Sequence, residues 1–312
     1  MFRRTWIRHL VVSIGLLIAA GACSAPVPAP VQGFEHYILT ADQKPISVLS
    51  ELLSLCSIKH DNSLDSIVQE TQKAWLRPAG IERFQMADVY ADRKAEFMPL
   101  FQKLALIDEI KPTKKQYCYC LVHGASMHAA RVRIAYVIKL WNDGVRFDQL
   151  VFLTGQRTLD SEKESVKELL DRTQKVLPVR IDWKQPEAMP ETESTMMRML
   201  YDQAQMPQAL RMVPFNVIDI PYQETAIGQK RRPNTQDTVR GWVKTNPFPG
   251  ACLAISNQPF IACQDTIMRA DLPKTNTLET VGASIALEDQ VSVSMTLDAL
   301  ARWLYQVNTY KK

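Results

Sequence analysis

The sequence predicts an α/β protein, in which about five mainly parallel strands alternate with helices after a helical N-terminal subdomain. Two observations lead to this prediction. From residue 115 onward, short continuous apolar runs alternate with stretches of helical periodicity, whereas residues 45–110 show helical periodicity alone. Continuous apolar runs are typical of strands buried on both faces, and strand–helix alternation favours right-handed crossovers and therefore a parallel sheet.

Composition and charge exclude several classes of protein. Of the 312 residues, 46% are hydrophobic and 22% are charged, which excludes a disordered chain and a multi-span membrane protein. The formal charge of +4 includes three arginines in the first 22 residues, a stretch without any acid. Without those three, the 37 basic residues fall to 34, against 33 acidic residues. A chain with so little net charge lacks the basic surface that binds nucleic acid, so no nucleic-acid partner is predicted.

Residues 1–22 are predicted to be a bacterial secretory signal peptide. Three arginines precede an apolar run from Leu10 to Ala20, and small residues lead into Cys23. The run has 11 residues, too few for a membrane-spanning helix, which needs about 20. Ala20-Gly21-Ala22-Cys23 resembles a lipobox, which predicts lipidation at Cys23 and a membrane contact through that lipid. The alternative is ordinary cleavage after Ala22 or Ala25 with an unmodified Cys23.

The rest of the chain divides into three predicted parts. Pro26, Pro28 and Pro30 make residues 23–33 a stiff tether. Residues 34–112 form the helical subdomain, and residues 113–312 form the α/β domain. The expected location is the bacterial cell envelope, on the periplasmic side and lipid-anchored, with a soluble periplasmic or secreted protein as the alternative.

The apolar patterns place the individual elements. In the N-terminal subdomain, apolar stripes cover residues 48–55, 62–68 and 97–106. The expected strands are Tyr117–His123, Gln149–Thr154, Pro214–Ile220, Ala251–Ser256 and, more weakly, Leu278–Val281. The expected helices between and after them are Met127–Asn142, Ser161–Val176, Glu193–Gln205, Asn234–Lys244, Phe260–Leu272 and Leu297–Tyr310.

The cysteines predict neither a disulfide framework nor a metal site. Five remain beyond Cys23, an odd number. Cys118 and Cys120 stand two apart on an expected strand, so they should share one face, too far apart to bond each other, and act as small buried apolar residues. A zinc site would need a second matched Cys or His pair, which is missing. One bridge, Cys252 to Cys263, stays open.

Polar loops after the expected strands form the candidate site. Ligands of an open parallel sheet bind beyond the carboxyl ends of the strands, where these loops converge. The residues expected to bind a small polar or anionic ligand are Gly124, Ser126, Gly155, Arg157, Glu193, Arg232, Asn234, Thr235, Asp237, Ser256 and Asn257.

Each residue type has a physical use in such a site. Gly124 permits close backbone approach, and Ser126 would cap a helix whose free amides face an anion. Arg157 and Arg232 could clamp a phosphate or carboxylate. Asn234 with Asp237 three residues later is typical of a capping box, which is also the purely structural alternative.

Few residues of this sequence suit catalysis, and whether the protein is an enzyme stays open at this point. His123, Glu193 and Asp237 are weak candidates for acid–base chemistry, although an acid at a helix start is favoured by the helix dipole alone. Neither a Gly-x-Ser-x-Gly nor a nucleotide-binding glycine motif is present. No metal is predicted, and no cofactor can be named.

Taken in order, the loops resemble a known family. The matching segments are Leu121-Val122-His123-Gly124-Ala125-Ser126, Arg133, Leu140-Trp141-Asn142-Asp143-Gly144, Leu150-Val151-Phe152-Leu153-Thr154-Gly155, Thr192-Glu193 with Met197, Asn234-Thr235-x-Asp237-Thr238 and Ala254-Ile255-Ser256. Together they are similar to the SanA/YdcF-like bacterial envelope proteins, a family of unknown biochemical function. The resemblance implies a Rossmann-like three-layer fold, a polar pocket at the strand ends and a role in envelope maintenance.

The chain also departs from the pattern of that family. Where the family has a His and an Arg after its Thr-Ser strand end, this chain has Asn257-Gln258-Pro259-Phe260. An activity that depends on that His is not expected here. The alternative function is a non-catalytic envelope scaffold, in which the polar loops only cap helices.

Overall fold

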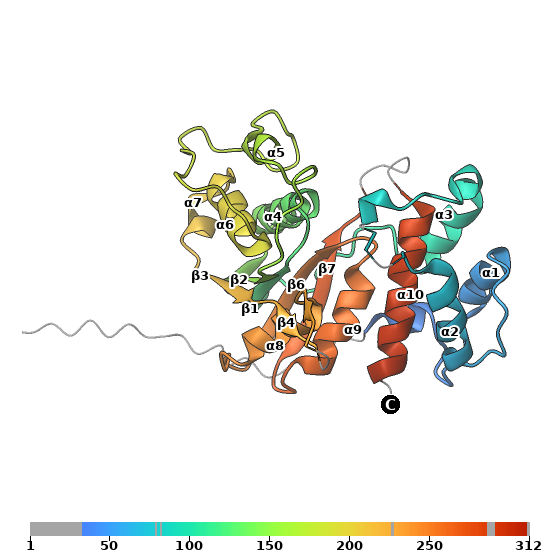
Figure 1. The fold of residues 1–312 in the computed structure, drawn as a ribbon. Helices are drawn as coiled ribbons and strands as arrows, with labels where there is room; N and C mark the ends of the chain where they lie inside the picture. Colours follow the sequence, from blue (N-terminus) through green and yellow to red (C-terminus); the bar gives the residue numbers. More distant parts are fainter. Residues whose placement is uncertain (1–32, 79, 82, 226–227, 286–290, 311–312) are drawn as a thin grey trace, which may run out of the picture.

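The computed structural model describes residues 33–310, apart from 79, 82, 226–227 and 286–290, and it confirms the α/β fold. Its main sheet has five strands in the order β3-β2-β1-β6-β7, and every neighbouring pair is parallel (Figure 1). The predicted signal peptide, Cys23 and nearly all of the predicted tether lie outside the described residues. Within the described part of the chain, no helix has the length and apolar character needed to cross a bilayer.

The described elements follow the predicted alternation closely. The strands are β1 (Gln116–His123), β2 (Arg146–Gly155), β3 (Phe215–Ile220), β6 (Ala251–Asn257) and β7 (Thr277–Ala283), with a small antiparallel ribbon of β4 (Gln223–Glu224) and β5 (Lys230–Arg231). The α-helices are α1 (Ser47–Leu55), α2 (Leu64–Trp75), α3 (Lys94–Lys103), α4 (Met127–Asn142), α5 (Val166–Leu170), α6 (Glu193–Gln203), α7 (Gln208–Arg211), α8 (Thr235–Val243), α9 (Ile261–Asp271) and α10 (Val293–Tyr310). Short 3-10 turns are η1 (Phe34–Tyr37), η2 (Arg83–Gln85) and η3 (Ala91–Arg93).

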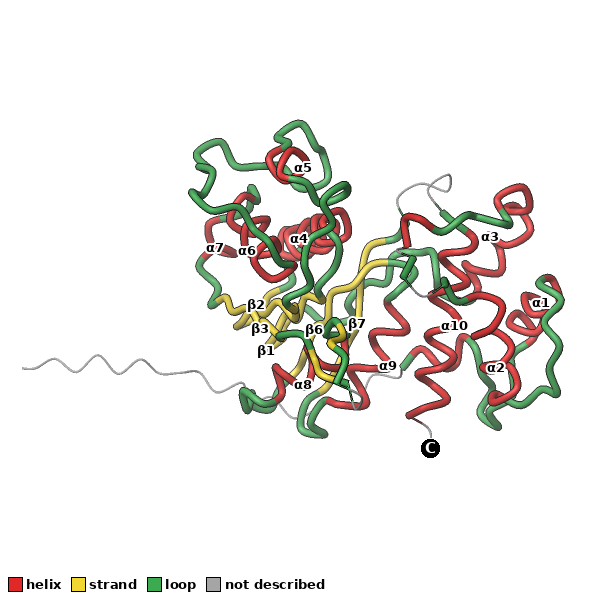
Figure 2. The backbone as a smooth tube through the Cα atoms, in the orientation of Figure 1, coloured by secondary structure: helices red, strands yellow, loops and turns green. Residues whose placement is uncertain are grey.

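One predicted helix is wrong. The pattern at Ser161–Val176 favours a helix, but only α5 is helical there. Asp171 ends it, because its carboxylate accepts hydrogen bonds from the backbone nitrogen and the hydroxyl of Thr173, at 2.8 and 2.7 Å, and so forms a local turn. The long segment between β2 and α6 is therefore mostly loop (Figure 2).

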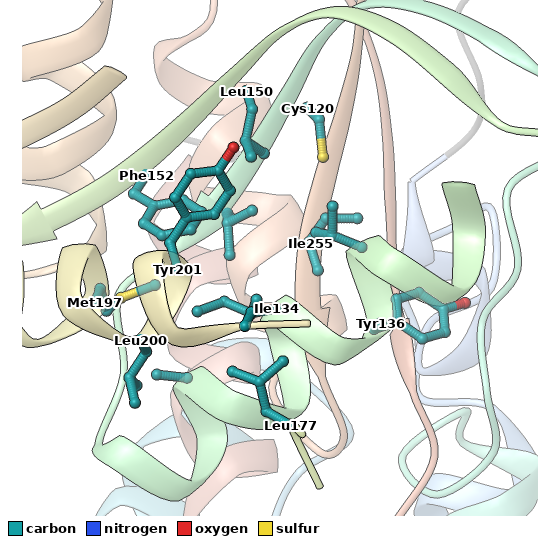
Figure 3. Packing of buried hydrophobic residues seen from close by; sticks show 14 of the residues in the cluster. Cys120, Ile134, Tyr136, Leu150, Phe152, Leu177, Met197, Leu200, Tyr201 and Ile255 are labelled. Atoms are coloured by element: carbon teal, nitrogen blue, oxygen red, sulfur yellow. The ribbon is translucent and has the colours of Figure 1, made fainter. Parts of the chain in front are cut away.

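Helices cover both faces of the sheet (Figure 1). On one face, α4 and α6 pack over β1 and β2 through a large apolar cluster (Figure 3). Phe152 of β2 meets Tyr201 of α6 edge to face there, with ring centroids 5.8 Å apart. On the other face, α8 and α9 pack through a smaller cluster that includes Trp242 and Met268. Cys118 belongs to this second cluster and Cys120 to the first, so the prediction that the two cysteines share one face of the strand is wrong. All five described cysteines are free thiols.

The N-terminal helices share their core with the C-terminal helix. Apolar side chains of α1, α2 and α3 form one cluster with α10 and the start of α9, and the fully buried Trp303 of α10 belongs to it. Gln72 of α2 also donates to the backbone oxygen of Ala301 at 2.8 Å. Helices α1, α2 and α3 therefore lie together with α10 in one layer beside the sheet (Figure 1).

The strand order creates a topological switch point between β1 and β6. The chain leaves β1 for β2 and β3 on one side, then crosses to β6 and β7 on the other. The loops after β1 and β6 therefore lead away from each other, and such a switch point is where open α/β sheets bind ligands.

Candidate functional site

Arg133 of α4 bridges the two strand ends at this switch point. Its Nη1 donates to the backbone oxygens of His123 and Gly124 at 3.0 and 2.7 Å, at the end of β1. Its Nε donates to Oδ1 of Asn257, the last residue of β6, at 2.8 Å. The residue is only 3% exposed, and Nη2 has no hydrogen-bond partner among the described residues. A buried cation with one nitrogen unengaged thus lies between two strand ends.

Gly124 and Glu193 meet beside this arginine. Glu193 is the first residue of α6, which begins with the capping box of Thr192 and Thr195. A β-carbon on Gly124 would collide with Oε1 of Glu193 and approach the Leu153 carbonyl oxygen to 3.0 Å. Only glycine leaves room for the carboxylate here, which explains the glycine in chemical terms.

Arg157 holds two carboxylates together. It forms a bidentate pair with Glu164, at 2.7 Å from Nη1 to Oε2 and 2.8 Å from Nη2 to Oε1. Its Nε donates to Oε2 of Glu193 at 3.1 Å. Further bonds from Nη1 and Nη2 reach the backbone oxygens of Thr158 and Ala125. Arg157 was expected to clamp a ligand, but all its nitrogens are engaged within the protein, so in this structure it positions Glu193.

Burial and neighbouring charges shift the pKa values of the charged groups in this cluster by different amounts and in different directions. Burial lowers the pKa of Arg133 to about 10, although the Glu193 charge opposes this shift, so Arg133 stays charged at neutral pH. Burial also raises the pKa of the Glu193 carboxyl, against the opposing charge of Arg157. For Glu164, burial raises the pKa, but hydrogen bonds from Arg157 and from the Asp160 and Met127 amides outweigh it and lower the pKa overall. Glu164 therefore remains an anion, whereas Glu193 can exchange a proton more readily.

The start of α4 differs from the prediction. Ser126 is the N-cap residue and is exposed, but its side chain makes no capping hydrogen bond. Instead, Oε1 of Glu164 accepts a hydrogen bond from the Met127 amide at 3.0 Å. Glu164, in the loop before α5, caps the helix with its carboxylate. The ion pair with Arg157 holds the carboxylate in this position. The expected capping role of Ser126 is therefore wrong.

The start of α8 adjoins the end of β2 on the other face of the sheet. A β-carbon on Gly155 would collide with the Pro233 ring, which places the loop before α8 against that strand end. The expected capping box is confirmed: Asp237 N donates to Asn234 Oδ1 at 3.0 Å, and Asn234 N donates to Asp237 Oδ2 at 2.8 Å. Asp237 also forms a bidentate pair with Arg231, at 2.6 and 2.9 Å.

The structure therefore brings together only part of the predicted set. Gly124, Arg157, Glu193 and Asn257 are linked through direct contacts or through Arg133. Gly155 touches this group on one side and the α8 loop on the other. In that loop Asn234 and Asp237 are engaged in capping and ion pairing, Arg232 is exposed, and Thr235 accepts a hydrogen bond from the Thr238 hydroxyl through its backbone oxygen.

His123 and Ser256 are buried at the strand ends. His123 is 1% exposed, and its Nε2 has no hydrogen-bond partner among the described residues. Burial and then the Arg133 charge lower its pKa to about 3, so the imidazole is neutral. Ser256 is fully buried and donates weakly to the Asn257 backbone oxygen at 3.4 Å. Both side chains are enclosed by the protein and are not open to solvent.

Two residues central to the site were missing from the expected set. Arg133 carries a usable signal, because it stands beside Ile134 on the buried side of a helix, where a charged residue needs a partner. Glu164 carries none, since it lies in an irregular loop and reaches its partners only through the fold.

The site can offer a buried cation, an adjacent carboxyl group and a close backbone approach. Such a set recognises an anionic group beside a hydroxyl or amine. Among the described residues, no group of three or more His, Cys, Asp or Glu side chains could hold a metal ion.

Comparisons of this chain with models of protein families, with curated proteins and with solved structures find no match. The resemblance to the SanA/YdcF-like proteins therefore stays a prediction.

Proposed function

We propose that this protein binds a small polar or anionic ligand at the switch point between β1 and β6. We further propose that it does so in the bacterial envelope, where a lipid on Cys23 holds it to the membrane and it serves envelope maintenance. The ligand class is nucleotide-like or derived from the cell wall. One observation supports the site most strongly: buried Arg133 joins the ends of both strands, and its Nη2 has no hydrogen-bond partner among the described residues.

The chemistry around Arg133 supports an anionic ligand with a second polar group. An arginine nitrogen in a desolvated setting makes stronger hydrogen bonds to a phosphate or carboxylate than one in water. Glu193 lies against Gly124, beside this arginine, so the same ligand could present a hydroxyl or amine to its carboxylate. Because burial raises the pKa of Glu193, this group would also be the first candidate for proton transfer.

A thermal-shift screen of the full chain against inorganic phosphate, nucleotides, sugar nucleotides and muropeptides tests this proposal. A ligand at 100 times its dissociation constant adds about 2.7 kcal/mol to the free energy of unfolding. Arg133→Lys keeps the charge but cannot make all the bonds of the guanidinium, and should weaken binding about tenfold or more. Arg240→Lys, at an exposed position on α8, is the matched control and should bind normally.

The scaffold function remains the second candidate, and one observation favours it. Arg157 and Asp237, two of the expected ligand-binding residues, are fully engaged in internal ion pairs. If no compound in the screen stabilises the chain, and if Arg133→Lys changes only the melting temperature, the scaffold function replaces ligand binding.

A further inference from the structure

A cavity lies along α6, away from the strand ends. Its volume is about 760 Å³, within the range of small-molecule sites. One wall is the outer face of α6, formed by Thr192, Thr195, Met199 and Asp202, whose spacing of three and four residues places them on one stripe. The opposite wall is the segment 180–191, which arches over α6 in Figure 1. Glu193 points inward to Gly124, so the two sites use different faces of this helix.

The arching segment is tied to its surroundings at both ends. Near its start, Val179 pairs with Ala204, and the Arg180 amide donates to the Gln203 backbone oxygen at 2.8 Å. Near its end, Thr192 pairs with Thr158. In the middle, Trp183 is only 7% exposed, and its backbone oxygen accepts from Arg172 at 2.8 Å. The cavity walls are therefore held in place without a ligand.

The lining combines an apolar floor with charges of both signs. Trp183 and Met199 are buried beneath the cavity. Arg180 and Asp182 neutralise each other in an ion pair of 2.9 Å. The remaining charged groups of the lining, which are Lys184, Glu191, Arg198 and Asp202, form no side-chain hydrogen bond or ion pair with any described residue. The Arg198 guanidinium carbon lies 5.7 Å from the centre of the Phe215 ring. Burial raises the pKa of Asp202, and the Arg198 charge opposes this shift.

Two cations and two anions, none of them in an ion pair with a described residue, lie over an apolar floor and suit a ligand that carries both charges. A purely anionic ligand would face Glu191 and Asp202, and a purely cationic ligand would face Lys184 and Arg198; each would meet like charge, which is unfavourable. A zwitterion with an apolar body satisfies both pairs. We propose that this cavity binds a short peptide with free ends, its carboxylate on Arg198 and its ammonium on Asp202.

Isothermal titration calorimetry of the full chain with the tripeptide Ala-Leu-Ala tests this proposal. Four forms are compared: both ends free, the N-terminus acetylated, the C-terminus amidated, and both ends blocked. The form with free ends should bind best, and blocking either end should weaken binding about tenfold, the expected effect of one charged hydrogen bond. Equal affinity of the doubly blocked peptide, or binding of none of the four forms at millimolar concentration, overturns the proposal.

Two variants assign the ends of the peptide. Arg198→Ala should weaken peptides with a free carboxylate and leave the amidated form unchanged, whereas Asp202→Asn should weaken peptides with a free ammonium and leave the acetylated form unchanged. Lys103→Ala, at an exposed position on α3, is the control. Both cavity variants change exposed side chains, so folding should persist, as circular dichroism would verify. Unaltered binding in both variants contradicts the assignment. An equal loss of affinity for the free, acetylated and amidated peptides contradicts it as well.

Discussion

The carboxylate of Glu193 occupies the space beside Gly124 that a β-carbon would need. This contact joins the first residue of α6 to the turn after β1, at the switch point where Arg133 bridges β1 and β6. The glycine is thus required by a neighbouring side chain, since its own φ does not lie in the left-handed region.

Gly124→Ala should destabilise the fold and disturb the site. Overpacking at a close contact costs about 1–3 kcal/mol, and the displaced carboxylate would lose its bond to Arg157. Urea unfolding of Gly124→Ala, Glu193→Ala and the double variant measures the coupling. In the Glu193→Ala background the collision with the carboxylate is gone and the nearest known neighbour is the Leu153 carbonyl at 3.0 Å, so the added alanine should cost clearly less. Equal costs in both backgrounds would show that Glu193 does not explain the glycine.

Arg157→Gln should be one of the most damaging single substitutions. It leaves Glu164, whose side chain is 2% exposed, as a buried anion without its bidentate partner. Such a loss typically costs about 3–5 kcal/mol in the free energy of unfolding. Arg93→Gln, which breaks an exposed pair with Glu96, is the control and should cost less than about 1 kcal/mol. Similar losses in the two variants would mean that the Arg157 cluster contributes no more than a surface pair.

Glu164 should make stability depend on acid pH. Its pKa in the folded state lies below the ordinary value of 4.5, so the folded state favours the anion. That stabilisation is complete above about pH 4.5 and is lost as the pH falls through the lower, folded pKa. Glu164→Gln should therefore be less stable than the wild type at pH 7, with a difference that shrinks toward pH 3. Urea unfolding at several pH values checks this, with the exposed Glu187→Gln as control. A difference independent of pH would contradict it.

Cys23 should carry a lipid. The short apolar run and the small residues before Cys23 predict cleavage and lipidation. Cys23→Ser removes the thiol that would carry the lipid. Metabolic labelling with a palmitate analogue should mark the wild type in the membrane fraction and not the variant. If both proteins are labelled alike, the lipid prediction fails, and ordinary cleavage after Ala22 or Ala25 becomes the better explanation of the N-terminus.

Local sequence carries most of the information on the strands and on the capped helices. The apolar runs at β1, β2, β3, β6 and β7 predicted all five strands of the sheet, because a strand buried on both faces must be apolar along its length. The capping box of Asn234 and Asp237 was readable for a similar reason, since both partners lie within one turn of helix. The failure at 161–176 is also local in origin: helical periodicity was present, but a turn at Asp171 competed with it.

The sequence by itself therefore determined the alternation of strands and helices, the parallel sheet and the edge at which polar loops gather, since these follow from periodicity and from the direction of the chain. Only the tertiary structure decided which of those polar groups are available. Arg157 and Asp237 look alike in sequence as possible ligand contacts, yet both are engaged by partners within the fold, whereas Arg133, inside a helix, becomes the residue between the strand ends. The physical reason is that a charged side chain is engaged by whichever opposite charges and polar groups the fold brings within about 3 Å. Those partners stand anywhere from 6 positions away, as for Arg231 and Asp237, to 124 positions away, as for Arg133 and Asn257.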